Sequence, residues 1–283
     1  MSFKHQISKL IFVAVVFPAL CLSMFALAPG MVTAAGAAGA ASAGGNEEIK
    51  NALRDLLRED PNLVLDVLRE NSELVLDIAQ QGSELRRHRI LVGQWRADLE
   101  VPKNVNLEGR PVKGPDKAPV TIVAYTDFTC LHCRNGEITL ERILKAYPGQ
   151  VRVVYKSLPM SSHPGAVEAA EFMLAAYMQS KEKSWKLFDD FFENRDLIVG
   201  KSGDTYLRSA ASARGLNMQK LLSDAKSARI KKMLQEDEKE AQALKIQGTP
   251  FFLVNNIEIR GALQENLFRE AVNMALAYEN AKK

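Results

Sequence analysis

Cys130 and Cys133 stand two residues apart, where an apolar run of the sequence gives way to a charged, helix-like one. The run before them, VTIVAYTDF, is rich in β-branched and aromatic residues and predicts a strand. A strand that leads into a helix would place Cys130 at the first helical turn, where unpaired backbone N–H groups and the helix dipole stabilise an anion. The spacing therefore predicts a redox pair, with Cys130 as a thiolate and Cys133 one turn further on and more buried.

His132 lies between the two cysteines, and we predict that its imidazole helps to stabilise the Cys130 thiolate rather than standing free in solvent. One Cys-x-x-Cys supplies only half of a tetrahedral zinc site, and His88 and His163 lie in other segments. We therefore predict no metal and no other cofactor. Binding of Cu(I), which accepts two thiolates, stays as an alternative.

A second informative element is Gly248-Thr249-Pro250, which leads into another apolar, strand-like run. An X–Pro bond can be cis at small cost, and a cis proline presents an open backbone edge beside a site. After a β-α-β unit that carries Cys-x-x-Cys, this triplet becomes a strong indication of such an edge.

The elements around these motifs follow the order β-α-β, helical insert, β-β-α. A helix to about Ala146 separates the first strand from a second at 150–158, and this is the unit of a parallel sheet. Residues 119–162 form the first half of the predicted domain, 163–246 a helical insertion, and 247–283 the second half with a hairpin turn at Asn255-Asn256. Within the insertion, an aromatic stripe on one helical face predicts core: Trp185, Phe188 and Phe192.

Residues 46–99 read as a separate helical segment, followed by a linker at 100–118 that is rich in proline, glycine and charge. Its apolar positions are more than a small segment can bury within itself. The helices either pack on the main domain or associate with other copies, and we favour a homo-oligomer.

The first 45 residues have the composition of a leader. Lys4 and Lys9 precede a long uncharged run that contains Cys21, and a tract of small residues follows. This pattern predicts a cleavable signal peptide and an exported protein, with an uncleaved membrane anchor as the alternative. The net charge of +3 is small and no basic block stands out, so we expect no nucleic-acid partner.

Four stretches, in order, resemble the thioredoxin-fold Dsb proteins of bacterial envelopes: VAYTDFTCLHC, HPGAVEAAEFMLAA, KSWKLFDDFFEN and IQGTPFFLVNNIEIRGAL. The resemblance covers about residues 118–280 and is to the DsbA-like branch, whose α/β thioredoxin fold carries an inserted helical domain. It implies that Cys130 is the exposed nucleophile and Cys133 the resolving thiol. It also implies that Pro250 is a cis proline facing them, that Thr249 offers backbone hydrogen bonds to an extended substrate, and that His132 lowers the pKa of the nucleophile.

The sequence departs from the family pattern at two positions. Leu131 stands where DsbA-like proteins usually have proline, and Ala124 stands where many thioredoxin-fold enzymes keep a buried acid for proton transfer. Asp127 and Glu137 are nearby candidates for that acid, but we expect an exposed capping role for each. The N-terminal helical segment resembles those of DsbC-like isomerases and of the DsbA-like suppressor-of-copper-sensitivity proteins.

These features predict a periplasmic protein disulfide oxidoreductase with isomerase capacity. Its expected partners are cysteine-containing exported proteins and a membrane redox partner of DsbB-like or DsbD-like type. Two alternatives remain: a chaperone or assembly module whose thiols are incidental, and a Cu(I)-binding envelope protein.

Overall fold

The computed structural model describes residues 41–282. The predicted leader, residues 1–45, lies outside the described residues except for the backbone from Ala41, so export remains a prediction. No helix in this described range is long and apolar enough to cross a membrane. The chain divides into two compact units, one up to Leu76 and the other from Asp77 to Lys283.

The first unit contains α1 (Ala41–Glu59), α2 (Asn62–Glu70) and the start of α3 (Ser72–Leu99). Asp60 accepts a hydrogen bond from the backbone N–H of Asn62 at 3.0 Å, across the turn at Pro61 that separates α1 from α2. None of the residues of α2 is buried, and large apolar side chains are exposed throughout the unit: Ile49, Leu53, Leu56, Val67 and Leu74.

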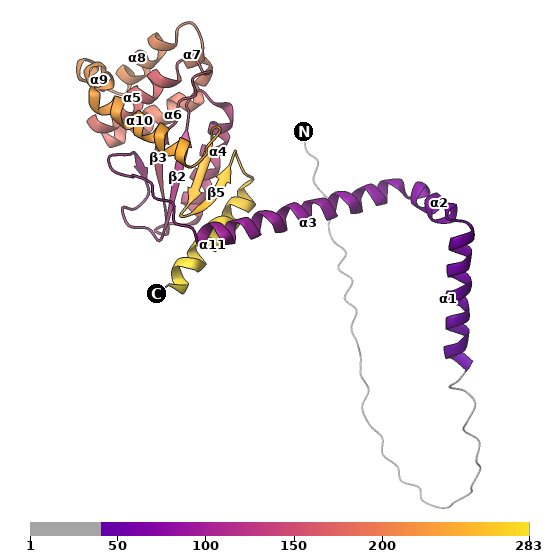
Figure 1. The fold of residues 1–283 in the computed structure, drawn as a ribbon. Helices are drawn as coiled ribbons and strands as arrows, with labels where there is room; N and C mark the ends of the chain where they lie inside the picture. Colours follow the sequence, from indigo (N-terminus) through magenta and orange to yellow (C-terminus); the bar gives the residue numbers. More distant parts are fainter. Residues whose placement is uncertain (1–40, 283) are drawn as a thin grey trace, which may run out of the picture. The chain divides into compact units, whose positions relative to one another are not determined.

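The second unit is built on a five-stranded sheet of order β1-β3-β2-β4-β5 (Figure 1). Its strands are β1 (Val112–Lys113), β2 (Val120–Thr126), β3 (Val151–Ser157), β4 (Phe251–Val254) and β5 (Ile257–Arg260). β2 and β3 are parallel, and the other neighbouring pairs are antiparallel. This sheet and the helices around it confirm the predicted thioredoxin-type α/β fold.

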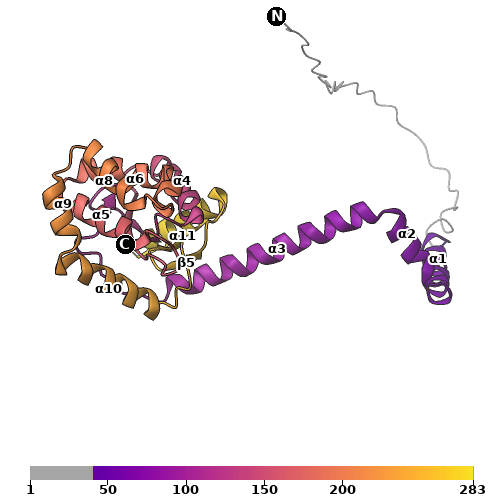
Figure 2. The same cartoon turned by 90° about the horizontal axis from the view of Figure 1, so that it is seen from above.

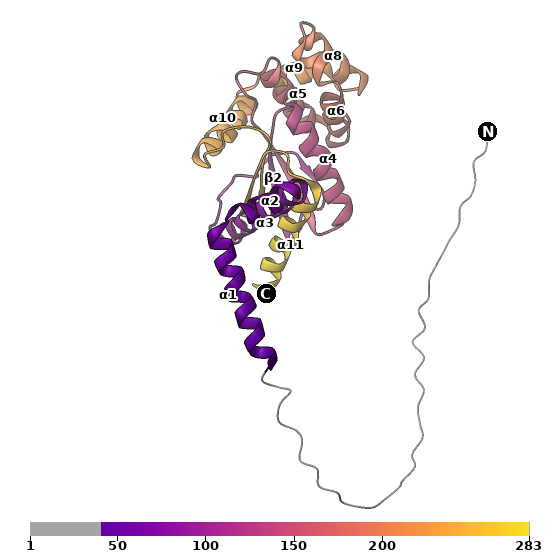
Figure 3. The ribbon, with the colours of Figure 1, turned by 90° about the vertical axis from the view of Figure 1, so that its right-hand side faces the viewer.

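Both faces of the sheet are covered by helices. Side chains alternate along β2, so that Ile122 and Ala124 pack toward α4 (Leu131–Ala146) and α11 (Glu265–Ala281), within the main core. Val123 and Tyr125 face the opposite side, where they form a smaller cluster with α10 (Ala228–Ala243). Figure 3 shows α10 and α4 on opposite sides of β2.

The insertion between β3 and β4 forms a group of helices (Figure 2). They are α5 (Ala166–Gln179), α6 (Lys181–Glu193), α7 (Arg195–Val199), α8 (Gly203–Ala213), α9 (Met218–Ala225) and α10. The aromatic stripe is core, as predicted: Phe188 and Phe192 are buried, and Trp185 packs against them. The ring of Phe128, just before the cysteines, lies 5.2 Å from that of Phe188 and 4.9 Å from that of Phe192, so the insertion packs directly on the turn that carries Cys130.

Two segments differ from the sequence-based expectation. The helical segment does not end as a separate body at residue 99, because Trp95 and Leu99 at the end of α3 are buried in the core of the second unit. The predicted linker contributes strand β1, and its Arg110 is buried, with Nε donating to Asp237 at 2.9 Å. A local pattern of proline, glycine and charge could not reveal a buried partner 127 residues away.

Candidate active site

The turn between β2 and α4 holds the first cysteine at the head of a helix. Cys130 is the N-cap residue of α4, with an extended backbone at φ −88° and ψ 120°. The backbone N–H of Cys133 donates to the Cys130 carbonyl at 3.1 Å, and the Cys130 N–H donates to the Asp127 carbonyl at 3.1 Å. Cys130 is 7% exposed and Cys133 2% exposed, so both free thiols are buried and the expectation of an exposed Cys130 is corrected. The cysteine reached more easily from solvent is therefore the one at the positive end of the helix dipole.

The distant triplet reaches the same place. β4 runs antiparallel to β2, with Tyr125 opposite Phe251, so the residues just before Phe251 lie at the end of the sheet where Cys130 begins α4. The Thr249–Pro250 peptide bond is cis, and the Cys130 thiol donates to the Thr249 carbonyl across 3.4 Å. The structure thus brings together two segments that lie 119 residues apart in the sequence.

Gly136 lies where α4 packs against Phe252 and the cis proline, and no local sequence pattern indicates this role. It lies on the buried side of α4, one turn after Cys133. A Cβ at this position would meet Phe252 Cζ at 2.8 Å and Pro250 Cγ at 3.4 Å. The absence of a side chain therefore leaves room for the ring of Phe252, two residues after Pro250, against the helix that carries both thiols.

The site favours a thiolate at Cys130 and a thiol at Cys133. The pKa of Cys130 is lowered to about 5, chiefly by a hydrogen bond from the Cys133 side chain. Burial opposes this effect. The side chain of Thr249 and the backbone N–H groups of Cys133 and His132 also lower the pKa. Burial, followed by the neighbouring Cys130, raises the pKa of Cys133 far above its usual range. The Thr249 hydroxyl is buried and has no hydrogen-bond partner within residues 41–282, so its proton is free to turn toward sulfur.

His132 and Leu131 occupy the positions between the thiols, and both are exposed. The contribution of His132 to the low pKa of Cys130 comes through its backbone N–H. Leu131 is 56% exposed and adds an apolar side chain to the surface beside the nucleophile.

Asp127 is buried, which corrects the expectation of an exposed cap. Its Oδ1 accepts from the backbone N–H of Thr129 at 2.7 Å, so it does close the turn before Cys130. Its Oδ2 accepts from the backbone N–H of Met160 at 3.0 Å and lies 2.7 Å from Nδ1 of His163. This carboxylate therefore ties the turn that carries the nucleophile to the loop after β3. The pairing with His163, 36 residues away, left no local signal in the sequence.

Glu137 is also buried, and here too the expectation of an exposed cap is wrong. Its carboxylate accepts from the Tyr155 hydroxyl at 2.8 Å and pairs with Lys113 Nζ at 2.8 Å. Burial raises the pKa of Glu137, and the charge of Lys113 opposes that rise. Glu137 lies one turn beyond Cys133 on the buried face of α4, and Tyr155, which donates to it, is the partner of Ala124 in the β2–β3 pairing.

Within the described range, no group of three or more histidine, cysteine or acidic side chains could hold a metal ion. The chemistry available at this site is that of two sulfurs of very different acidity beside an open peptide edge.

The sequence of the chain was compared with family models and with known proteins. A family model described as thioredoxin matches residues 106–274, more than half of the chain. A probable disulfide bond formation protein D from Bacillus cereus is 30% identical over 148 residues, which cover 50% of this chain and 68% of that protein. An Na(+)/H(+) antiporter NhaA 1 from Salinispora arenicola is 30% identical over 198 residues, but they span 68% of this chain and only 28% of the antiporter.

Solved structures agree with the family match. A thioredoxin-like oxidoreductase from Silicibacter pomeroyi is 27% identical, with a TM-score of 0.53, and the match covers 59% of this chain and 92% of that one. Proteus mirabilis ScsC in a compact conformation matches 82% of this chain and 99% of its own, with a TM-score of 0.53 and 18% identity, a likeness that shows the fold alone. The chain therefore belongs to the thioredoxin family, and its fold is that of the DsbA-like thiol–disulfide oxidoreductases within it.

Proposed function

We propose that this protein forms and rearranges disulfide bonds in cysteine-containing exported proteins, with Cys130 as nucleophile and Cys133 as resolving thiol. The observation that carries the proposal is the Cys130 sulfur at the head of α4, 3.4 Å from the carbonyl oxygen that precedes a cis proline. An activated thiolate and an open peptide edge are the two parts that exchange with a polypeptide substrate requires.

In the oxidising direction, a substrate thiolate attacks the Cys130 sulfur of the Cys130–Cys133 disulfide. The Cys133 sulfur leaves and takes up a proton, since its raised pKa favours the thiol. The second substrate thiolate then attacks the substrate sulfur of the mixed disulfide, and Cys130 leaves as a thiolate. Two electrons pass from the substrate to the protein, and the low pKa of Cys130 makes it a good leaving group.

In the isomerising direction, reduced protein attacks a wrong substrate disulfide through Cys130. A substrate thiol that attacks the mixed disulfide completes the exchange without net oxidation, and Cys133 releases the protein when no such thiol is available. A reactive thiolate at neutral pH serves both directions, so the partner that resets the pair decides which one dominates.

Two further residues complete the proposed site. The main chain of Thr249 would hydrogen-bond to an extended substrate beside Pro250, where a cavity of about 340 Å³ is also lined by Arg260. His132 would act through its backbone N–H, and its exposed imidazole would lie beside the mixed disulfide. We propose no metal or organic cofactor.

The leader-like N-terminus supports a periplasmic location, where a membrane redox partner of DsbB-like or DsbD-like type would reset the thiols. The small net charge supports a role without nucleic acid. The exposed apolar side chains of α1 and α2 support a homo-oligomer, which would place several thiol pairs around one substrate and so favour isomerisation.

Oligomerisation is tested by the mass of the protein in solution. The double variant Leu53→Glu/Val67→Glu places charge on two side chains that are 53% and 58% exposed, so each chain should still fold. We expect the wild type to have the mass of several chains and the variant that of one. A wild-type protein with the mass of one chain would remove the argument for isomerisation.

Exchange is tested with reduced, unfolded ribonuclease and with its scrambled form. Cys130→Ser should abolish both the oxidation and the reshuffling of the substrate, whereas Cys133→Ser should accumulate the mixed disulfide because the resolving thiol is missing. Unchanged activity in Cys130→Ser would reject the proposal and leave the chaperone alternative.

A further inference from the structure

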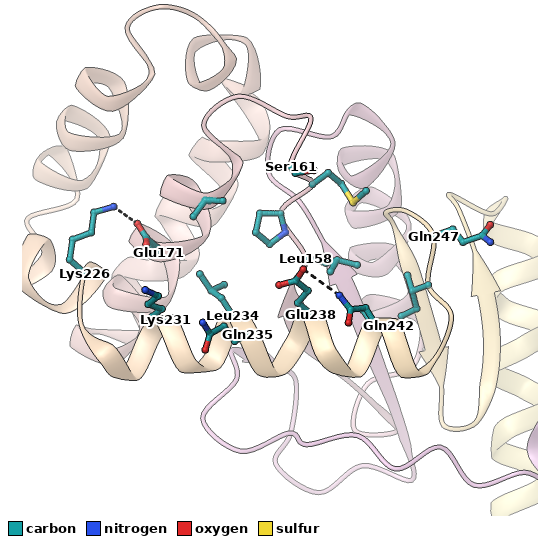
Figure 4. A pocket seen from close by; sticks show the side chains of 15 residues that line it. Leu158, Ser161, Glu171, Lys226, Lys231, Leu234, Gln235, Glu238, Gln242 and Gln247 are labelled. Atoms are coloured by element: carbon teal, nitrogen blue, oxygen red, sulfur yellow. Dashed lines mark hydrogen bonds and ion pairs between the residues drawn. The ribbon is translucent and has the colours of Figure 1, made fainter.

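A groove of about 690 Å³ lies between α10, the start of α5 and the loop after β3. In Figure 4 it follows α10 from Lys226 at one end to Gln247 at the other. Six residues of α10 line it, and each has another of them three or four positions away: Lys231, Leu234, Gln235, Glu238, Ala241 and Gln242. They therefore form one face of the helix.

The groove combines an apolar floor with a polar rim. Leu158, Val167 and Ile246 are among its apolar residues, and Val167 is 43% exposed, so the floor is open to a ligand. Lys231 and Glu238 on the rim carry opposite charges, and Lys226 is paired with Glu171 at 2.6 Å. The charges balance, which does not favour a phosphate, a nucleotide or a strongly charged peptide.

Three glutamines line the rim: Gln235, Gln242 and Gln247. A side-chain amide both donates and accepts hydrogen bonds, as each peptide unit of an extended chain does. An apolar floor for alternate side chains and amides for the main chain are the two features by which a groove holds an extended polypeptide of no fixed sequence.

The groove and the cavity at the cis proline share one lining residue. Gln247 lines this groove and also the smaller cavity that contains Thr249 and Pro250. α10 has 16 residues and is about 24 Å long at 1.5 Å per residue. At about 3.3 Å per residue, an extended chain of about seven residues would run its length.

The wall formed by α10 is held rigidly in place. On its inner side, Asp237 is fully buried and is paired with Arg110 at 2.9 Å and with Lys156 at 3.2 Å. Lys156 also bonds to Glu240. A wall that does not have to be ordered on binding retains more of the free energy of contact.

We propose that this groove binds an apolar, extended segment of the substrate polypeptide, next to the segment whose cysteine reacts with Cys130. The inference rests on the proposed function, since it extends the substrate site away from the thiols. It gives the protein a preference for unfolded chains, which expose such segments, over folded proteins.

The test uses a peptide that cannot take part in exchange. A fluorescent, cysteine-free peptide of about seven residues, with leucine alternating with serine, is titrated with the full-length protein while its anisotropy is measured. Val167→Glu places a charge on the groove floor, and because Val167 lies in the first turn of α5, an acidic residue there does not oppose the helix dipole. Ile138→Glu is the matched control, since Ile138 is also 43% exposed and does not line the groove.

We expect Val167→Glu to weaken peptide binding about tenfold or more, because the new carboxylate would be desolvated by the apolar side chains of the bound peptide. We expect Ile138→Glu to leave peptide binding unchanged. Exchange with a small dithiol should be equal in all three proteins, whereas oxidation of unfolded ribonuclease should slow only in Val167→Glu. Peptide binding that is absent in the wild type, or equal in Val167→Glu, would overturn the inference. A wild-type protein that does not exchange with a small dithiol would instead refute the proposed function. The peptide titration would then still test the groove independently.

Discussion

Gly136 gives a sharp test of the packing that positions the site, because a single methyl group can be added there. In Gly136→Ala the new Cβ would lie 2.8 Å from Phe252 Cζ, so either α4 or the ring of Phe252, two residues after Pro250, must shift. Overpacking of this kind costs about 1–3 kcal/mol. Alanine in place of glycine within a helix contributes about 1 kcal/mol in the opposite direction.

Gly93→Ala separates these two effects. Gly93 is also helical, in α3, and a Cβ there has nothing within 4 Å. We expect Gly93→Ala to raise the free energy of unfolding by about 1 kcal/mol. Gly136→Ala should fall below that control by about 1–3 kcal/mol, measured by urea unfolding of both variants.

Gly136→Ala should also change the pKa of Cys130. If Pro250 is displaced, Thr249 moves away from Cys130 and one of the groups that lower its pKa is weakened. The pH midpoint of alkylation of Cys130 should therefore rise in Gly136→Ala and stay constant in Gly93→Ala. Equal stabilisation by the two alanines, with equal midpoints, would refute the claim that the loop packs on this glycine.

Three further outcomes follow from buried groups. Lys156→Met leaves the buried Asp237 without one of its cations and should lower the free energy of unfolding by about 3–5 kcal/mol. Lys186→Met, at an exposed ion pair, should change that free energy by less than about 0.5 kcal/mol, and equal losses of unfolding free energy in the two variants would contradict this. Thr249→Ala removes the hydroxyl that favours the thiolate and should raise the alkylation midpoint of the nucleophile by about one to two pH units, while Thr249→Ser should leave it in place. Burial raises the pKa of Glu137, so the folded state holds the carboxyl proton more tightly than the unfolded state. As pH rises from the carboxyl pKa of the unfolded state through that of the folded state, the wild type should therefore lose stability relative to Glu137→Gln. A difference in unfolding free energy between the two proteins that stays constant across this pH window, measured in urea, would contradict this.

The sequence predicted those parts of the site that depend on local pattern. A β-rich run followed by two cysteines and a helix is enough to place Cys130 at a helix start, and Asn255-Asn256 is enough to indicate a hairpin, in which Asn255 has a φ of 52°. A run rich in β-branched and aromatic residues also predicted the strand at 120–128, where the structure has β2. In each case the signal and the structure lie within a few residues of one another.

What the sequence did not reveal depends on distant partners. Asp127 and Glu137 were expected to be exposed because acids near a helix start usually cap it, but His163 and Tyr155 satisfy them inside the protein. The predicted linker includes Arg110, and its local sequence does not reveal the buried partner Asp237 on α10. The groove likewise arises where α10 passes beside α5 and the loop after β3, an arrangement that no local pattern contains.

The central claim is that folding holds Cys130 as a thiolate beside the peptide edge at Pro250, and the ultraviolet absorbance of the thiolate measures it directly. The reduced protein would be titrated with acid, and the signal of Cys130→Ser would be subtracted. We expect a transition with a midpoint near pH 5, so that Cys130 is almost wholly ionised at neutral pH. A midpoint close to the value of about 8.5 for an ordinary thiol would contradict it.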